Sequence, residues 1–253
     1  MSESVYAIAN QKGGVGKTTT TVNLAAVFAA EGRRTLVVDL DQQANATVAL
    51  GIPKRTTPSS YEVLAGEVAA IEAVVPGPVP NLELIPASRD LAGSAVELAS
   101  VDDPPFRLSR QLGPLTDRYD AILLDCPPAL GLVTVNALVA SDRVIVPVQA
   151  EYLALEGLIE FLDTLATVRR ELNPSLELAG VVVTMHDERT RLAQDVERDV
   201  RDHFSETVFQ TVVPRTVRLA EAPSYGLPVS EYAPGSRGAS AYRSLAAEVT
   251  ERG

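Results

Sequence analysis

Short apolar runs, separated by longer amphipathic stretches, recur along most of the chain. Six runs of mostly apolar and often β-branched residues, bounded by polar or turn-forming residues, predict strands. Because the apolar character is continuous rather than alternating, we expect these strands to be buried on both faces, as in parallel sheets. The six predicted strands are residues 5–9, 35–39, 81–86, 121–125, 144–148 and 178–184.

Seven intervening segments have the length and pattern of helices. Strands that alternate with helices are typical of an α/β fold, here one domain spanning residues 1–253 with a twisted, mostly parallel β-sheet covered by helices on both faces. The proline-rich residues 75–80 are interpreted as a surface loop rather than a domain boundary. The predicted helices are residues 18–30, 91–100, 105–118, 131–140, 152–172, 190–204 and 239–251.

Composition narrows the class of protein further. With 253 residues, 46% of them apolar, the chain can bury a substantial core. No apolar run is long enough for a transmembrane helix and no secretory leader is recognisable, so we expect a cytoplasmic protein with no membrane partner. The single cysteine, Cys126, excludes an intrachain disulfide and an iron–sulfur bridge, and is expected to be a buried structural thiol. A net charge of −11 argues against a broadly basic, nucleic-acid-coating protein but leaves a local basic patch open.

The segment Lys-Gly-Gly-Val-Gly-Lys-Thr at residues 12–18 follows the first predicted strand and opens the first predicted helix. Glycines allow successive backbone N–H groups to face one anion, and the helix N-terminus adds partial positive charge. In this arrangement Lys17 would neutralise the outer phosphates and the Thr18 hydroxyl would bind Mg²⁺. The alternative is a glycine-rich turn that binds no ligand. The order of strand, loop, Lys-Thr and helix favours a phosphate-binding loop instead. The residues expected to bind Mg-ATP are Lys12, Gly13, Gly14, Val15, Gly16, Lys17, Thr18 and Thr19.

The segment departs from the common phosphate-loop motif, since Gln11 replaces a glycine and Lys12 adds a second lysine. This variant resembles the deviant Walker A motif of the ParA/MinD family of ATPases, and the wider chain is similar to its chromosomal ParA (Soj) branch. The resemblance implies a P-loop NTPase fold, slow ATP hydrolysis, and an ATP-sandwich homodimer in which Lys12 reaches the partner's phosphates. The matching segments are residues 10–23, 38–51, 124–140, 146–157, 213–226 and 236–238.

Three aspartates follow predicted strands and are expected to face the phosphate loop. Asp39 and Asp41 are two residues apart, so in an extended chain both point the same way, about 6–7 Å from each other. Asp125 ends another strand, and acids at neighbouring strand ends suit a hydrated Mg²⁺. The resemblance implies that Asp125 is the Walker B carboxylate and that Asp41 positions the attacking water, with Asp39 supporting the metal. A cap or surface acid is the alternative for each.

The chain departs from the family pattern in the loop after Asp41. Gln42 stands where the family usually has proline, so we expect a looser loop after Asp41. Pro214 and Thr216 lie in a segment similar to the one that lines the adenine in the family. A purely structural loop is the alternative for this segment.

The local charge argues against DNA binding, whereas the resemblance implies it. Arg189 and Arg218 match arginines that the family uses to bind DNA without sequence preference, for which phosphate contacts suffice. Against this, six arginines face seven acids between residues 187 and 218, and Asp187 with Arg191 and Glu197 with Arg201 have the spacing of helical ion pairs. A dimer could gather sparse arginines from two subunits onto one face.

The resemblance therefore implies a DNA-partitioning ATPase of chromosomes or plasmids, associated with the nucleoid and stimulated by a ParB-like centromere-binding partner. The alternative is a MinD-like positioning ATPase for a cargo other than DNA. The short, acidic residues 246–253 do not form the basic amphipathic helix that a MinD-type membrane anchor needs. A metal-carrier ATPase would need two ligating cysteines, and the chain has one. A non-catalytic scaffold is also disfavoured, because it would not need Lys17, Thr18, Asp41 and Asp125 together.

Overall fold

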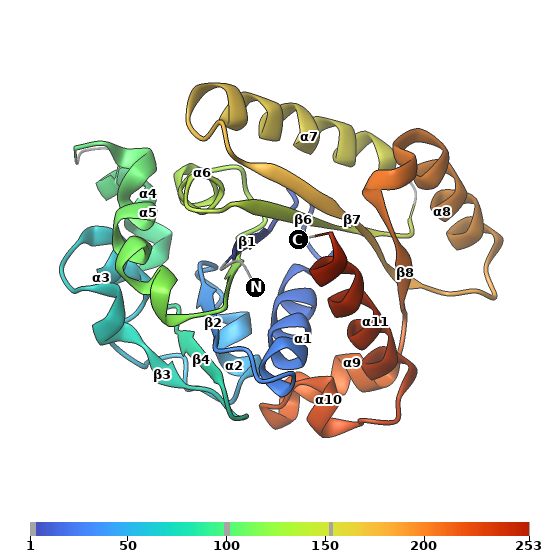
Figure 1. Cartoon of the computed structure of the whole chain (residues 1–253), viewed down its shortest axis with the longest axis horizontal. Helices are drawn as coiled ribbons and strands as arrows, with labels where there is room; N and C mark the ends of the chain where they lie inside the picture. Colours follow the sequence, from blue (N-terminus) through green and yellow to red (C-terminus); the bar gives the residue numbers. More distant parts are fainter. Residues whose placement is uncertain (1–3, 99–101, 152–153, 253) are drawn as a thin grey trace.

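A computed structural model describes residues 4–98, 102–151 and 154–252, and its strands form one eight-stranded sheet (Figure 1). The order across the sheet is β3-β4-β2-β5-β1-β6-β7-β8. Neighbouring strands are parallel except β3 and β4, which are antiparallel, so the mostly parallel sheet is confirmed. The strands are β1 (Ser4–Ile8), β2 (Thr35–Asp39), β3 (Val75–Pro76), β4 (Leu82–Ile85), β5 (Ala121–Asp125), β6 (Arg143–Gln149), β7 (Glu177–His186) and β8 (Val208–Pro214).

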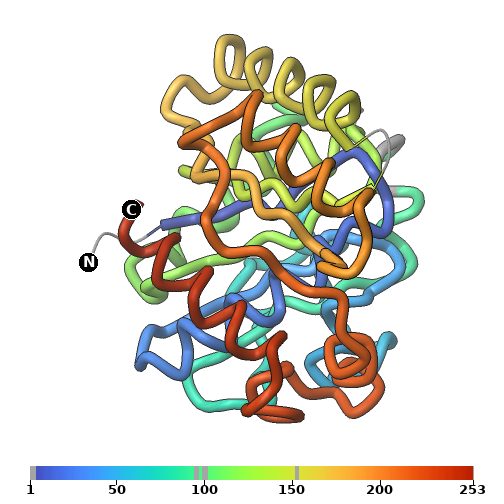
Figure 2. The backbone as a smooth tube through the Cα atoms, turned by 90° about the vertical axis from the view of Figure 1, so that its right-hand side faces the viewer, coloured from blue at the N-terminus to red at the C-terminus, as the bar shows by residue number. Residues whose placement is uncertain are grey.

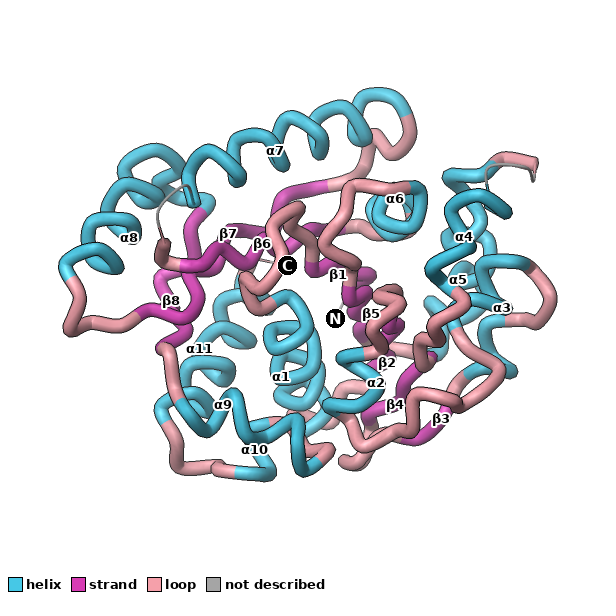
Figure 3. Tube along the Cα trace, turned by 180° about the vertical axis from the view of Figure 1, so that it is seen from behind, coloured by secondary structure: helices cyan, strands magenta, loops and turns pink. Residues whose placement is uncertain are grey.

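Helices cover both faces of this sheet, as Figures 1 and 3 show from opposite sides. On one face lie α1 (Lys17–Ala30), α2 (Asn45–Ala49), α9 (Val217–Glu221), α10 (Val229–Tyr232) and α11 (Arg237–Glu251). On the other lie α3 (Ser60–Ala65), α4 (Leu91–Leu98), α5 (Arg107–Leu112), α6 (Leu132–Val139), α7 (Ala154–Glu171) and α8 (Arg191–Phe204).

Each face of the sheet has its own hydrophobic core, and the alternation of side chains along the strands divides residues between them. In β1, Val5 and Ala7 pack with the α3–α8 side, whereas Tyr6 and Ile8 pack with the α1–α11 side. All five residues of β1 are buried. This double burial explains why the strands read as continuous apolar runs rather than as alternating ones.

Helix α11 lies alongside α1 and β8 (Figure 2), and its apolar side is part of the second core. Tyr242, Leu245, Ala246 and Val249 are each at most 1% exposed. The apolar side of this last helix is therefore occupied by the fold itself. Within the described part of the chain, no helix combines the length and apolarity needed to cross a bilayer.

Two predictions about elements were wrong. Residues 105–118 do not form one helix: α5 ends at Leu112 and a 3₁₀ helix, Gly113–Arg118, follows. Pro114 accounts for the break, since its ring removes an N–H donor and clashes with a continuing α-helix. Residues 75–80 are not wholly a loop, because Val75 and Pro76 pair with β4 at the edge of the sheet. The predicted ends of two helices, residues 99–100 and 152–153, fall outside the described residues.

The parallel register aligns the carboxyl ends of the central strands. Asp125 of β5 is paired with Ile8 of β1 on one side and with Asp39 of β2 on the other. The loops that leave these three strands consequently start from the same edge of the sheet, where ligands bind in open α/β folds.

Candidate nucleotide-binding site

The glycine-rich loop between β1 and α1 has a backbone that only glycine adopts readily at two positions. Gly14 and Gly16 have φ angles of 77° and 90°, in the left-handed region. Gly16 caps α1 and supplies no side-chain hydrogen bond to its first turn. The N–H groups at the start of α1 could therefore meet an anion, with the helix dipole adding favourable charge.

Hydrogen bonds to two distant strands, β6 and β7, hold this loop in place. Asn10 donates from Nδ2 to the Pro147 carbonyl at 2.8 Å, and its Oδ1 accepts a hydrogen bond from the Lys12 amide at 2.9 Å. The Thr184 hydroxyl donates to the Val15 carbonyl at 2.7 Å. Sequence analysis did not single out Asn10 or Thr184 for this role, because both contacts join segments more than a hundred residues apart.

The two loop lysines differ in environment. Lys17 is 7% exposed, and its Nζ donates to the Lys12 carbonyl at 3.1 Å. Burial lowers the pKa of Lys17, while nearby negative charge, that of Asp125 above all, opposes that shift. The Lys12 side chain makes no hydrogen bond or ion pair with any residue that the structure describes. Lys17 is thus built into the loop, and Lys12 is available to a group outside it.

Asp125 is fully buried and joined to the first turns of α1. Its Oδ2 accepts a hydrogen bond from the Thr18 hydroxyl at 2.8 Å, and its Oδ1 accepts one from the Thr21 hydroxyl at 3.1 Å. Burial, followed by the charge of Asp39, raises the pKa of Asp125. Sequence analysis missed Thr21, although its position three residues after Thr18 places both on one side of the helix.

Asp39 is also fully buried, and both of its oxygens are engaged by the protein. Oδ2 accepts hydrogen bonds from the Thr47 amide at 2.8 Å and the Thr47 hydroxyl at 2.7 Å, while Oδ1 accepts one from the Asp41 amide at 3.1 Å. Burial raises the pKa of Asp39, and these hydrogen bonds oppose the shift. Asp39 therefore links the end of β2 to α2 and to the segment that carries Asp41.

The donor set at this edge fits Mg²⁺. Two buried carboxylates lie side by side in register, and burial makes the ionised form of both unfavourable without a nearby cation. In the described residues, no three His, Cys, Asp or Glu side chains converge to form a metal cage. A magnesium ion bound through Thr18 and Asp125 would therefore complete its shell with water and phosphate oxygens, as Mg²⁺ commonly does.

Asp41 lies at the start of the loop that leads into α2. It is 8% exposed, and its Oδ1 accepts a hydrogen bond from the Gln43 amide at 2.9 Å. The loop closes with a hydrogen bond from the Ala44 amide to the Asp41 carbonyl at 2.8 Å. Ala44 has a φ of 53°, an uncommon conformation for a residue other than glycine. The carboxylate of Asp41 is therefore oriented by its own loop.

A cavity of about 540 Å³ brings the predicted adenine segment next to the phosphate loop. Gly16 and Thr19 line it from one side, and Pro214 and Thr216 from the other. This volume is within the range of small-molecule sites. The Thr216 hydroxyl accepts a hydrogen bond from the Leu219 amide at 3.3 Å and thereby caps α9, so its side chain has a structural task as well.

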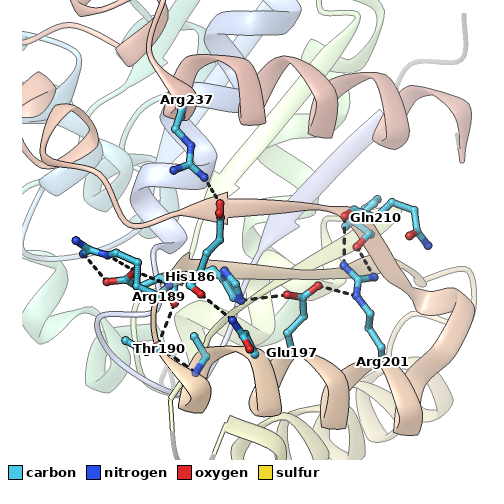
Figure 4. Close-up of polar contacts among 12 residues, drawn as sticks. His186, Arg189, Thr190, Glu197, Arg201, Gln210 and Arg237 are labelled. Atoms are coloured by element: carbon cyan, nitrogen blue, oxygen red, sulfur yellow. Dashed lines mark hydrogen bonds and ion pairs between the residues drawn. The ribbon is translucent and has the colours of Figure 1, made fainter.

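The two arginines predicted to bind DNA are exposed, but each is paired with an acid. Arg189 binds Asp187 through Nε to Oδ1 at 2.8 Å and Nη2 to Oδ2 at 2.7 Å (Figure 4). Its guanidinium holds the pKa of Asp187 well below the usual range. Arg218 pairs with Glu221 at 2.9 Å. Both arginines would have to exchange these partners, or share them, to bind phosphate.

The two ion pairs expected from helical spacing had different outcomes. Arg201 pairs with Glu197 at 2.9 Å, as expected, and the same glutamate lies 3.1 Å from Nε2 of the buried His186 (Figure 4). Asp187 pairs with Arg189 instead of Arg191. The reason is that α8 begins at Arg191, so Asp187 lies before the helix and helical spacing does not apply.

Cys126 follows Asp125 directly and is 1% exposed. Burial, with a contribution from the charge of Asp125, raises the pKa of its thiol, so the thiolate needed for nucleophilic attack is disfavoured. The expected buried thiol is confirmed.

Comparisons with known proteins agree on the class of site. A family model described as an AAA domain matches residues 3–178. The chromosome-partitioning ATPase Soj of Thermus thermophilus is 53% identical, over 97% of this chain and 95% of that protein. The sporulation initiation inhibitor protein Soj of Bacillus subtilis is 48% identical, over 98% of this chain and 99% of that protein.

A solved structure shows the same fold with a nucleotide. The crystal structure of cobyrinic acid a,c-diamide synthase from Mycobacterium smegmatis with bound ADP and magnesium superimposes with a TM-score of 0.86. It is 39% identical in sequence, and the alignment covers 98% of this chain and 93% of that chain.

Proposed function

Because this chain belongs to the family of Soj and ParA chromosome-partitioning ATPases, we propose that it is an ATP-dependent dimerising switch in DNA partitioning. It hydrolyses ATP to ADP and phosphate slowly on its own and faster with DNA and a ParB-like partner. The observation that carries the proposal is the convergence, at one edge of the sheet, of the phosphate loop, the Thr18–Asp125 hydrogen bond and Asp41.

The chain's residues divide the work of phosphoryl transfer, which depends mainly on positioning and charge. The backbone of residues 13–19 and the Lys17 ammonium hold the phosphates, and Pro214 and Thr216 border the base. Thr18 and Asp125, supported by Asp39, would hold a Mg²⁺ ion, which would neutralise charge on the phosphate oxygens. Asp41 orients the attacking water, and Lys12 extends to the phosphates of a second subunit.

ATP joins two subunits in this proposal, and its hydrolysis releases them. The free side chain of Lys12 supports such a contact across subunits. In the ATP-bound dimer, Arg189 and Arg218 of both subunits contact DNA phosphates on one face. The protein is then cytoplasmic and associated with the nucleoid only in its ATP state.

The test is DNA binding measured against salt concentration with ATP, with ADP and without nucleotide. We expect retention only with ATP, falling as salt rises because counterions compete for the phosphates. Lys17→Ala serves as the control that cannot bind ATP and should show no retention. Equal DNA binding in all three nucleotide states would contradict an ATP-gated dimer.

A MinD-like positioning ATPase for another cargo is the second candidate. It would turn over ATP and dimerise, but would not bind DNA at any salt concentration. The buried apolar side of α11 disfavours a membrane anchor built from this helix.

A further inference from the structure

Lys54 is outside the motifs of the nucleotide site, yet it contacts the segment that carries Asp41. Its Nζ donates a hydrogen bond to the Gln43 carbonyl at 2.7 Å. Only three of the 22 basic residues are lysines, and the other two are in the phosphate loop. We propose that Lys54 is a positioning residue that fixes the loop of residues 41–44, and with it the carboxylate of Asp41.

The loop is anchored at its two ends, but its exposed middle has few contacts. The Asp41 carboxylate is bonded to the Gln43 amide, and the Asp41 carbonyl to the Ala44 amide, but these bonds are internal to the loop. Gln42 and Gln43 are exposed, and no proline restricts this segment. In the described part of the chain, Lys54 supplies the one side-chain hydrogen bond that joins residues 42–44 to a more distant segment. The Asp41 amide is bonded to Asp39 Oδ1 at 3.1 Å and Ala44 is buried, so Lys54 fixes the exposed residues 42–43 that lie between these two anchors.

The position of Lys54 supports its proposed role in positioning the loop. Together with Thr18, Thr19 and Asn45 it lines a hollow of about 310 Å³ between α1 and α2. The loop is therefore held from the side where Thr18 bonds Asp125. A lysine ammonium suits this task because it is compact and carries three donors, so it can bind one carbonyl without needing the planar partner that a guanidinium prefers.

This inference rests on the proposed role of Asp41, and kinetics can test it in the full-length chain. Lys54→Met removes the donor and keeps the apolar stem. We expect single-turnover hydrolysis to slow about 3- to 10-fold, the range that one hydrogen bond supports, with the Kd for ATP unchanged. Lys54→Arg keeps a donor but not the compact ammonium, so it should restore only part of the rate. Arg55→Met, which removes the adjacent exposed cation, is the matched control and should hydrolyse ATP normally.

A double-mutant cycle separates positioning from a direct contact with nucleotide. If Lys54 acts through Asp41, Lys54→Met should add no further loss to Asp41→Ala. An additive loss, or a parallel rise in the Kd for ATP, would overturn the proposal. If Asp41→Ala hydrolyses ATP slowly but Lys54→Met hydrolyses it normally, the proposal for Lys54 is overturned and the role of Asp41 stands. Normal turnover by Asp41→Ala would remove the role of Asp41 and the proposal together.

Discussion

At the scale of single residues, burial raises the pKa values of two aspartates at this site. Asp39 and Asp125 are fully buried next to each other, and each has a pKa raised mainly by desolvation. The folded, metal-free protein therefore binds protons at these groups more tightly than the unfolded chain does. Their contribution to stability is complete below the ordinary aspartate pKa and is lost as pH rises through the raised values.

We therefore predict that Asp125→Asn flattens the pH dependence of stability in the metal-free protein. Without Mg²⁺, the free energy of unfolding of the wild type should fall from about pH 4 to about pH 8, and that of the variant should fall less. Urea denaturation in the presence of a chelator measures both. Asp102→Asn, at an exposed aspartate, should reproduce the wild-type profile. A variant as pH-dependent as the wild type would contradict the assignment to Asp125.

A second prediction for single residues concerns Asp187, the acid that pairs with Arg189. Asp187→Asn removes one negative charge and weakens the bidentate pair, so DNA affinity in the ATP state should rise about 3- to 10-fold, whereas Arg189→Ala should lower it. Fluorescence anisotropy with a short duplex measures the affinities.

The matched control is Asp120→Asn. Asp120 has the same bidentate pairing with Arg34, through Nε and Nη2, at the opposite end of the strands. This substitution should leave DNA affinity nearly unchanged. Similar gains from Asp187→Asn and Asp120→Asn would indicate a general effect of net charge rather than a site at Arg189.

At the scale of elements, Thr47 connects α2 to the sheet through one hydroxyl. It donates to Asp39 at 2.7 Å and accepts a hydrogen bond from the Ala87 amide at 2.9 Å. Thr47→Val keeps the volume but leaves buried polar groups without their partner, so it should destabilise the protein by about 1–3 kcal/mol. Denaturant titration measures the change, and Thr56→Val, at an exposed hydroxyl, should cost far less. A neutral Thr47→Val would show that α2 is not held through this bond.

The elements also show what could be predicted from the sequence and why. Strands such as β2 and β5 were predicted at their observed bounds, because continuous apolar runs reflect burial on both faces. The five-residue helices α2 and α9 were missed, since they are too short to show a helical period. The phosphate loop was recognisable because it is contiguous. The roles of Asn10, Thr184 and Lys54 depend on contacts between distant segments, which local patterns do not report.

At the scale of the whole molecule, the Lys12 ammonium can contact a second subunit, because it has no hydrogen bond or ion pair with the residues that the structure describes. We predict that Lys12→Ala binds ATP with near wild-type affinity but remains monomeric, because Lys17 supplies the buried cation within the subunit. Light scattering coupled to size-exclusion chromatography with a slowly hydrolysed ATP analogue measures the mass. Asp41→Ala should dimerise under the same conditions. Dimerisation of Lys12→Ala would assign the contact between subunits to other residues.

The register of β1, β2 and β5 has a further consequence for how the molecule opens. These three strands are flanked on both sides and buried on both faces, whereas β3 is a two-residue strand at the edge. Their amide hydrogens should therefore exchange with deuterium last, at the rate of global unfolding, while those near β3 exchange early. Loops around the site can then open many times between nucleotides while the strand ends from which they start keep their places.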